Sequence, residues 1–183
     1  MSTKVNKVRT YDLTKIALCV ALLCVSSYFV IPLAFSPIVL SLHTIMVNLI
    51  GFILNTKQAG ATLCIYLLMG AIGLPVFSVG TGGLGKLLGP TGGFYFGFLL
   101  SVVVISCVKG KNNSLWRYLV VTIAIGLPIQ HLCAIIMMYL HNGFQLKVAF
   151  FSVSLPFIIG DILKCIMASV AASGVNRTLR TTN

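Results

Sequence analysis

Hydrophobic residues are grouped along this chain in long runs that short polar or glycine-rich segments separate. Each run approaches the roughly 20 apolar residues that a helix needs to cross a bilayer. Only the letters NTKQ stand between the second and third runs, which indicates a tight helical hairpin. A loop rich in Gly and Pro, at 75–91, separates the third run from the fourth. The pattern predicts six transmembrane helices, at about 13–31, 38–54, 58–74, 92–108, 116–140 and 151–173.

The composition indicates the same class of protein. Hydrophobic residues make up 58% of the chain and charged residues 8%, whereas soluble domains carry roughly 25% charged residues. Only Asp12 and Asp161 are acidic. We therefore expect an all-α membrane protein, with residues 1–183 forming one domain in the cell membrane. The first run, with basic residues before it and PLAFS at its end, also resembles a signal peptide, but it is longer than a usual signal-peptide core.

The basic residues predict the orientation in the membrane. A net charge of +11 would suit a nucleic-acid-binding protein, but these residues lie in short clusters between apolar runs and form no basic stripe. With six crossings, one side receives only Lys86 and Lys147, and the other receives Lys4, Lys7, Arg9, Lys15, Lys57, Lys109, Lys111, Arg117, Arg177 and Arg180. The positive-inside rule then predicts that both termini are cytoplasmic and that the 75–91 loop is extracytoplasmic.

The glycine run in that loop is close to a nucleotide-binding motif. GTGGLGK contains the G-x-x-x-x-G-K of a P-loop, at Gly80, Gly85 and Lys86. A P-loop needs Ser or Thr after the lysine to hold Mg²⁺, and this chain has Leu87 there. The predicted external position also separates the loop from ATP. We interpret it as a lid, because glycine lets backbone approach a ligand closely; a plain flexible connection is the alternative.

A charged pair in the last predicted helix is the strongest candidate binding site. Asp161 is the only acidic residue within a predicted span, and Lys164 is the only basic residue deep within one. Residues three apart share one face of a helix and can pair. A charge inside a membrane is costly, so such residues usually mark a functional site. A pair that only fixes helix packing is the alternative. As a site, it would suit a small molecule with N–H donors beside a carbonyl or carboxylate.

Other chemistry finds little support. The second catalytic group that acid–base work needs is missing, since no second carboxylate accompanies Asp161. We therefore predict that the protein is not an enzyme. The histidines show no metal-ligand spacing, and we expect free thiols and neither a metal nor a cofactor. The six cysteines all fall within apolar runs, at Cys19, Cys24, Cys64, Cys107, Cys133 and Cys165.

Four segments of the sequence resemble the BioY family, the biotin-specific S components of energy-coupling factor (ECF) transporters. In chain order they are FSPIVLSLHT, YLLMGAIGLPVF, GTGGLGKLLGPTGGFYFGFLL and PFIIGDILK. The resemblance covers nearly the whole chain. It implies a six-helix membrane subunit that captures biotin outside the cell for import, with Asp161 and Lys164 at the biotin head group. The partners it implies are an ECF transmembrane coupling subunit and its ATPases.

The resemblance also implies roles for single residues. Thr81 lies in the loop expected to close over the ligand, where relatives carry a polar side chain such as Asn. Tyr95 stands where some relatives carry an arginine that would meet the biotin carboxylate, and Lys86 is a candidate to replace that charge. His43 stands where many relatives have glutamine. Ala17 and Ala21 match the A-x-x-x-A by which S components dock on the coupling subunit, although alanines so spaced also suit internal helix packing.

Three other functions stay open from the sequence. One is an S component for another vitamin, such as thiamine or riboflavin. The second is a membrane-embedded enzyme that uses Asp161 as a base, and the third is a channel or scaffold protein. Only a binding protein would take up one small molecule saturably without converting it, and transport without energising partners is a further possibility.

Overall fold

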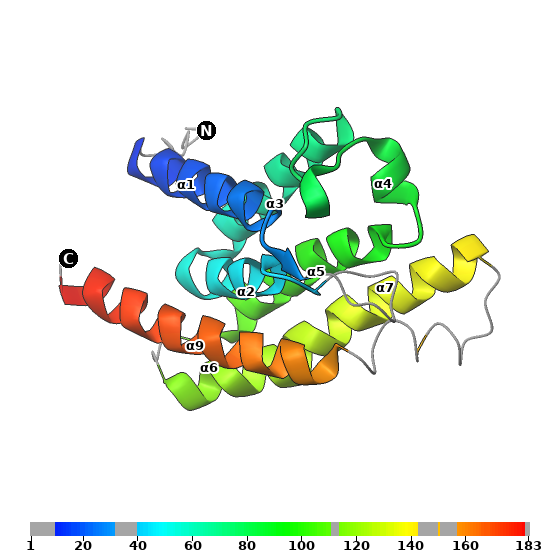
Figure 1. Ribbon diagram of the computed structural model, residues 1–183. Coiled ribbons are helices and arrows are strands. Elements are labelled where there is room, and N and C mark those ends of the chain that lie inside the picture. The colour runs from blue at the N-terminus through cyan, green and yellow to red at the C-terminus, as the bar shows by residue number, and fades with distance from the viewer. Residues whose placement is uncertain (1–9, 32–39, 111–113, 143–149, 151–156, 182–183) are drawn as a thin grey trace, which may run out of the picture.

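The computed structural model describes residues 10–31, 40–110, 114–142, 150 and 157–181. Helices make up most of these ranges (Figure 1). Two short strands, β1 (Val30–Ile31) and β2 (Leu40–Ser41), pair antiparallel with Val30 opposite Ser41. The helices are α1 (Thr10–Ser26), α2 (His43–Ile53), α3 (Thr56–Ala71), α4 (Leu84–Leu88), α5 (Gly92–Val108), α6 (Leu115–Val121), α7 (Leu127–Asn142) and α9 (Ile158–Thr181), with a 3-10 turn η1 (Ser78–Gly80) and a π-helical turn η2 (Thr122–Gly126).

Several predicted helix ends are wrong. The first helix ends at Ser26, not at 31, and the second begins at His43, not at 38. Val30–Ile31 and Leu40–Ser41 pair as strands instead, and Pro32 disfavours a helical conformation at Ile31 before it. The last helix extends to Thr181, past the predicted end at 173, and its described part begins at Ile158; the predicted start at 151 lies outside the described residues.

The predicted span 116–140 is one helical run that contains a π-helical turn. The backbone N–H of Leu127 donates to the carbonyl of Thr122, five residues earlier. Pro128 explains the widening, since its ring clashes with the carbonyl four residues before it and it has no N–H to donate. The run Leu115–His141 has mean hydropathy 2.2 and is the one helix in the described part of the chain that is long and apolar enough to cross a membrane by itself.

Helices α2 and α5 form the centre of the bundle. Helix α5 packs against α7, α2 and α3, while α2 also contacts α9 and α1. In Figure 1, α1 begins and α9 ends at the left, whereas α4 and the end of α7 lie at the right. With 11 residues, α2 is only about 16 Å long. Its backbone is satisfied within the helix and its side chains are mostly buried, so other helices rather than lipid surround it.

Small residues allow α5 and α7 to approach closely. Gly93 and Gly97 lie one turn apart on α5 and face α7. A β-carbon on Gly93 would stand 2.7 Å from the Ala134 α-carbon, and one on Gly97 would stand 2.9 Å from the Gln130 α-carbon. One turn further along, the Gln130 side-chain amide donates to the Ser101 hydroxyl at 3.0 Å. Close backbone contact with one buried hydrogen bond is the usual way helices associate in lipid.

The bundle has apolar side chains outside and polar side chains inside. Leu18, Leu68, Leu132 and Met167 are each more than half exposed. In contrast, the buried polar residues include His43, Asn48, Thr62, Ser101, Thr122, Gln130, His131, Asp161, Lys164 and Ser169. An apolar outer surface is stable in lipid and unfavourable in water, which agrees with the composition. This is a helical membrane protein.

The loop predicted at 75–91 is partly folded and is held against the bundle. It contains η1 and α4. The Val79 N–H donates to the Ser27 carbonyl at the end of α1, at 3.1 Å, and the Gly83 N–H donates to the Gly70 carbonyl at 2.7 Å. Helix α3, not a strand, precedes this segment, so the strand–loop–helix context that a P-loop requires is not present around Lys86.

Candidate functional site

A cavity of about 220 Å³ lies between the loop and the ends of three helices. An enclosed space of about 150 Å³ holds a benzene molecule, so this cavity has room for a small bicyclic ligand. Polar side chains from β2, α2, η1 and α4 meet aromatic ones from α5, and α9 adds a charged pair. The described residues that line it are Ser41, Thr44, Ser78, Val79, Lys86, Thr91, Phe94, Tyr95, Phe98, Phe157, Asp161 and Lys164.

The charged pair lies at the wall formed by α9. The Lys164 ammonium nitrogen is 2.9 Å from Asp161 Oδ1, and both residues are buried. Asp161 lies in the first turn of α9, where unpaired backbone N–H groups favour a negative charge. Both groups keep hydrogen-bonding capacity for a ligand: the Asp161 carboxylate can accept further hydrogen bonds, and the Lys164 ammonium has two hydrogens left beside the one it donates to Asp161.

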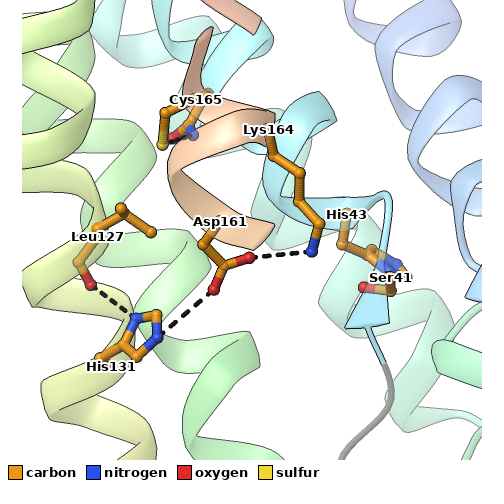
Figure 2. A network of polar contacts seen from close by, with 8 residues as sticks. Ser41, His43, Leu127, His131, Asp161, Lys164 and Cys165 are labelled. Atoms are coloured by element: carbon orange, nitrogen blue, oxygen red, sulfur yellow. Dashed lines mark hydrogen bonds and ion pairs between the residues drawn. The ribbon is translucent and has the colours of Figure 1, made fainter. Parts of the chain in front are cut away.

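His131 of α7 is a third member of this cluster, and sequence reasoning did not find it. Its Nε2 lies 3.5 Å from Asp161 Oδ2 (Figure 2). Its Nδ1 lies 3.1 Å from the Leu127 carbonyl, and because a carbonyl only accepts, Nδ1 carries a hydrogen. A proton on Nε2 as well would make an imidazolium that pairs with Asp161. No sequence spacing links positions 131 and 161, so only the packing of α7 near α9 reveals this contact.

The aromatic wall is formed mainly by α5. Phe94 and Phe98 are one turn apart, and Tyr95 lies between them in sequence. The Tyr95 hydroxyl accepts from the Ser78 backbone N–H at 3.1 Å and lies 3.4 Å from the Ser78 hydroxyl. Its ring is 4.3 Å from that of Phe77, between centroids. Tyr95 therefore ties the loop to α5 as well as lining the cavity.

The loop supplies a separate positive charge. Lys86 of α4 lines the same cavity as the Asp161–Lys164 pair. In Figure 1, α4 lies near the end of the bundle, across from the left-hand ends of α1 and α9. The lining of the cavity thus combines an ion pair from α9, aromatic side chains from α5 and a cationic group on the loop. This arrangement suits a small molecule with a polar head, an apolar body and an anionic end.

Four of the five predicted ligand residues line this cavity: Asp161, Lys164, Lys86 and Tyr95. Thr81 is not among the described lining residues, and its hydroxyl donates to the Ser78 carbonyl at 2.8 Å. The predicted docking residues Ala17 and Ala21 lie on the exposed face of α1, away from the cavity.

Several lining residues were missed. Ser41, Thr44 and Thr91 look like ordinary helix-end polar residues in sequence, and Phe94, Phe98 and Phe157 look like lipid-facing or core apolar residues. The period of α5 was the one available signal, since positions four apart share a face, but that signal does not say which face meets a cavity.

The fold and the site together define a helical membrane protein with a cavity large enough for a small molecule. The sequence model of the BioY family matches residues 1–181, and this chain belongs to the BioY family. Biotin transporter BioY2 of Lactococcus lactis subsp. cremoris is 32% identical over 96% of this chain and 95% of its own length. Biotin transporter BioY of Thermotoga maritima is 33% identical over 88% of this chain and 93% of its own.

Two further comparisons agree. A probable biotin transporter BioY of Rickettsia prowazekii is 30% identical over 92% of this chain and 85% of its own length. The crystal structure of the S-component for biotin from an ECF-type ABC transporter superposes with a TM-score of 0.83, covering 97% of this chain and 95% of that one. At 23% sequence identity, this likeness shows a shared fold.

Proposed function

We propose that this protein is a biotin-capture subunit of a membrane vitamin transporter, and not an enzyme. The observation that carries the proposal is the cavity in which the buried Asp161–Lys164 pair and Lys86 both take part. Membership of a family whose relatives are named biotin transporters supports it.

The chemistry of biotin matches the cavity from head to tail. The ureido ring has two N–H donors and one carbonyl, for which the Asp161 carboxylate and the Lys164 ammonium are complementary partners. The fused rings and the alkyl chain suit the aromatic side chains of Phe94, Tyr95 and Phe98. The carboxylate of the tail meets Lys86 under the loop. Thr81 stays a candidate contact that a movement of the loop would have to bring to the ligand.

The proposed topology has six crossings, cytoplasmic termini and an external loop at 75–91. Among described residues, Lys57, Lys109 and Arg117 lie at the helix ends opposite the loop that carries Lys86, and this bias supports the orientation. Lys4, Lys7, Arg9, Lys111 and Lys147 lie outside the described residues. An impermeant maleimide tests this orientation on whole cells that carry a cysteine-free variant with a single new cysteine at 85 or at 57. We expect labelling at 85 only, and labelling at 57 and not at 85 would reverse the orientation.

The proposed partners are an ECF coupling subunit and its ATPases. Helix α1 presents Ala17 and Ala21 on an exposed apolar face beside Leu18 and Leu22. Small residues on such a face let a partner helix approach closely. We propose that this face docks the coupling subunit in the cell membrane.

Equilibrium binding of labelled biotin to the detergent-purified protein tests the central proposal, with thiamine and riboflavin as competitors. We expect saturable binding that unlabelled biotin displaces and the other vitamins do not. Displacement by thiamine or riboflavin alone would reassign the substrate. A folded sample that binds none of the three would refute the proposal, and chemical conversion of bound biotin would favour an enzyme that uses Asp161.

A further inference from the structure

His43 is the centre of a chain of hydrogen bonds that starts at the cavity wall. It is the first residue of α2 and is fully buried. Its Nδ1 lies 3.2 Å from the hydroxyl of Ser41, which lines the cavity. Its Nε2 lies 2.7 Å from the hydroxyl of Tyr66 on α3. That hydroxyl in turn lies 2.9 Å from the carbonyl of Val76 at the start of the loop.

The Val76 end of this chain of hydrogen bonds fixes which atom donates at each step. The Val76 carbonyl only accepts, so Tyr66 donates its one hydrogen there. The Tyr66 oxygen is then the acceptor for His43, which places the imidazole hydrogen on Nε2. A neutral imidazole has one such hydrogen, so Nδ1 is an acceptor and Ser41 must donate to it.

The surroundings of His43 favour this neutral form. Its ring is stacked on Phe98, with centroids 5.9 Å apart, and Tyr66 and Tyr95 pack around it. An imidazolium here would be buried without a counter-ion, because the nearby charged group is the Lys164 ammonium (Figure 2).

We propose that this chain of hydrogen bonds makes Ser41 a fixed hydrogen-bond acceptor for an N–H group of the ligand, with His43 and Tyr66 as the residues that position it. Since the Ser41 hydrogen points to His43, only oxygen lone pairs remain for the cavity. The inference rests on the proposed function and deepens it by assigning a specificity-determining contact.

The order of groups along the cavity wall supports the assignment. Figure 2 shows the Lys164 ammonium reaching between Asp161 and the Ser41–His43 pair, and Ser41, Asp161 and Lys164 all line the cavity. The wall therefore presents an acceptor, a donor and an acceptor in sequence. A ureido edge presents a donor, an acceptor and a donor, so Asp161 and Ser41 each take one N–H while Lys164 takes the carbonyl. A ligand with only one N–H beside its carbonyl leaves either Ser41 or Asp161 without a partner.

Substitutions along this chain of hydrogen bonds separate the orientation of the Ser41 hydroxyl from the mere presence of its oxygen. Ser41→Ala removes the acceptor, and we expect biotin affinity to fall about tenfold. In Tyr66→Phe the Nε2 hydrogen loses its acceptor, so the imidazole hydrogen moves to Nδ1 and the Ser41 hydroxyl turns toward the ligand. A donor would then face a donor, and we expect a loss of at least about tenfold. The double variant should bind no more weakly than Ser41→Ala alone, because both changes act through one oxygen.

His43 allows a conservative rescue. Glutamine has one acceptor oxygen and one donor nitrogen on its amide, so His43→Gln can accept from Ser41 and donate to Tyr66 at the same time. We expect it to bind biotin within about threefold of the wild type. His43→Leu keeps the bulk but removes both functions, so the Ser41 hydroxyl is no longer held as an acceptor, and biotin affinity should fall further than in His43→Gln.

Two controls exclude a general loss of structure. Tyr118 is buried near the opposite end of the bundle and accepts from Asn176 at 3.0 Å; Tyr118→Phe removes a buried hydroxyl far from the cavity and should leave biotin affinity unchanged. Each variant is also checked for monodisperse elution and cooperative thermal unfolding. If Tyr66→Phe does not fold, the Ser41 and His43 variants still test the chain.

The ligand supplies the decisive measurement. Biotin methylated at one or the other ureido nitrogen lacks one N–H, and isothermal titration against wild type and Ser41→Ala compares the two isomers. For one isomer, Ser41→Ala should cause no further loss, while for the other it should cost about the same as for biotin. Additive losses in the Ser41/Tyr66 double variant, or unchanged biotin affinity in Ser41→Ala, would overturn the assignment. If wild type itself does not bind biotin, the proposed function fails instead.

Discussion

The buried ion pair allows its structural and binding roles to be separated. Lys164 and Asp161 are 2.9 Å apart, with about a twelfth of each side chain exposed (8% and 8%). Neutralising one partner leaves the other ion buried without compensation, which typically costs about 3–5 kcal/mol. Asp161→Asn and Lys164→Met should therefore each lower the stability of the protein in detergent by roughly this amount. His131, 3.5 Å from Asp161, offers no negative charge to replace the carboxylate.

The double variant, Asp161→Asn with Lys164→Met, should behave differently in the two assays. With both ions replaced, no uncompensated charge stays buried, so its stability should return close to that of the wild type. Binding should not recover. A hydrogen bond to a charged group contributes about 1.5–3 kcal/mol, so losing both charges should weaken biotin binding by about 10²- to 10⁴-fold.

Thermal unfolding followed by circular dichroism and titration with labelled biotin measure the two quantities on the same samples. A double variant that binds biotin as tightly as the wild type would reduce the pair to a structural role. A double variant as unstable as the single ones would refute the argument from uncompensated charge.

Three further experiments test other parts of the structure. Lys86→Met should weaken binding of biotin about tenfold but leave binding of biotin amide, whose tail is uncharged, nearly unchanged; equal losses for both would remove Lys86 from the carboxylate. Gly93→Ala should destabilise the protein by about 1–3 kcal/mol, because a β-carbon there meets the backbone of α7. The control is Gly174→Ala on α9, where a β-carbon would meet no atom within 4 Å, and this change should be neutral or slightly stabilising. Equal unfolding temperatures for the two variants would contradict the packing argument. Replacing Ala17 and Ala21 with leucine should leave biotin binding intact but prevent co-purification with a coupling subunit, and an intact complex would show that another face docks.

Much of the membrane architecture follows from local sequence. A long apolar run in lipid can satisfy its backbone hydrogen bonds by itself only as a helix. For this reason α3, α5 and the run through α6 and α7 begin and end within a few residues of the predicted positions. The π-helical turn before Pro128 was not predicted, although a proline inside a helical run is a known cause of such a turn. The ends near β1 and β2 were not predictable, because two-residue strands depend on a pairing partner elsewhere in the chain and leave no periodic signal of their own.

The site divides in the same way. Asp161 and Lys164 stand out in the sequence because a charge inside an apolar run is energetically costly in a membrane, and their spacing within one helix already makes them neighbours. Their relation to His131 depends on the packing of a different helix. The chain from Ser41 through His43 and Tyr66 to Val76 joins β2, α2, α3 and the loop, and no local rule brings these together. The sequence alone determined which segments are apolar enough for lipid and which charged residues mark a candidate site. The tertiary structure decided which polar atoms meet, because hydrogen bonds between helices depend on distances that only packing sets.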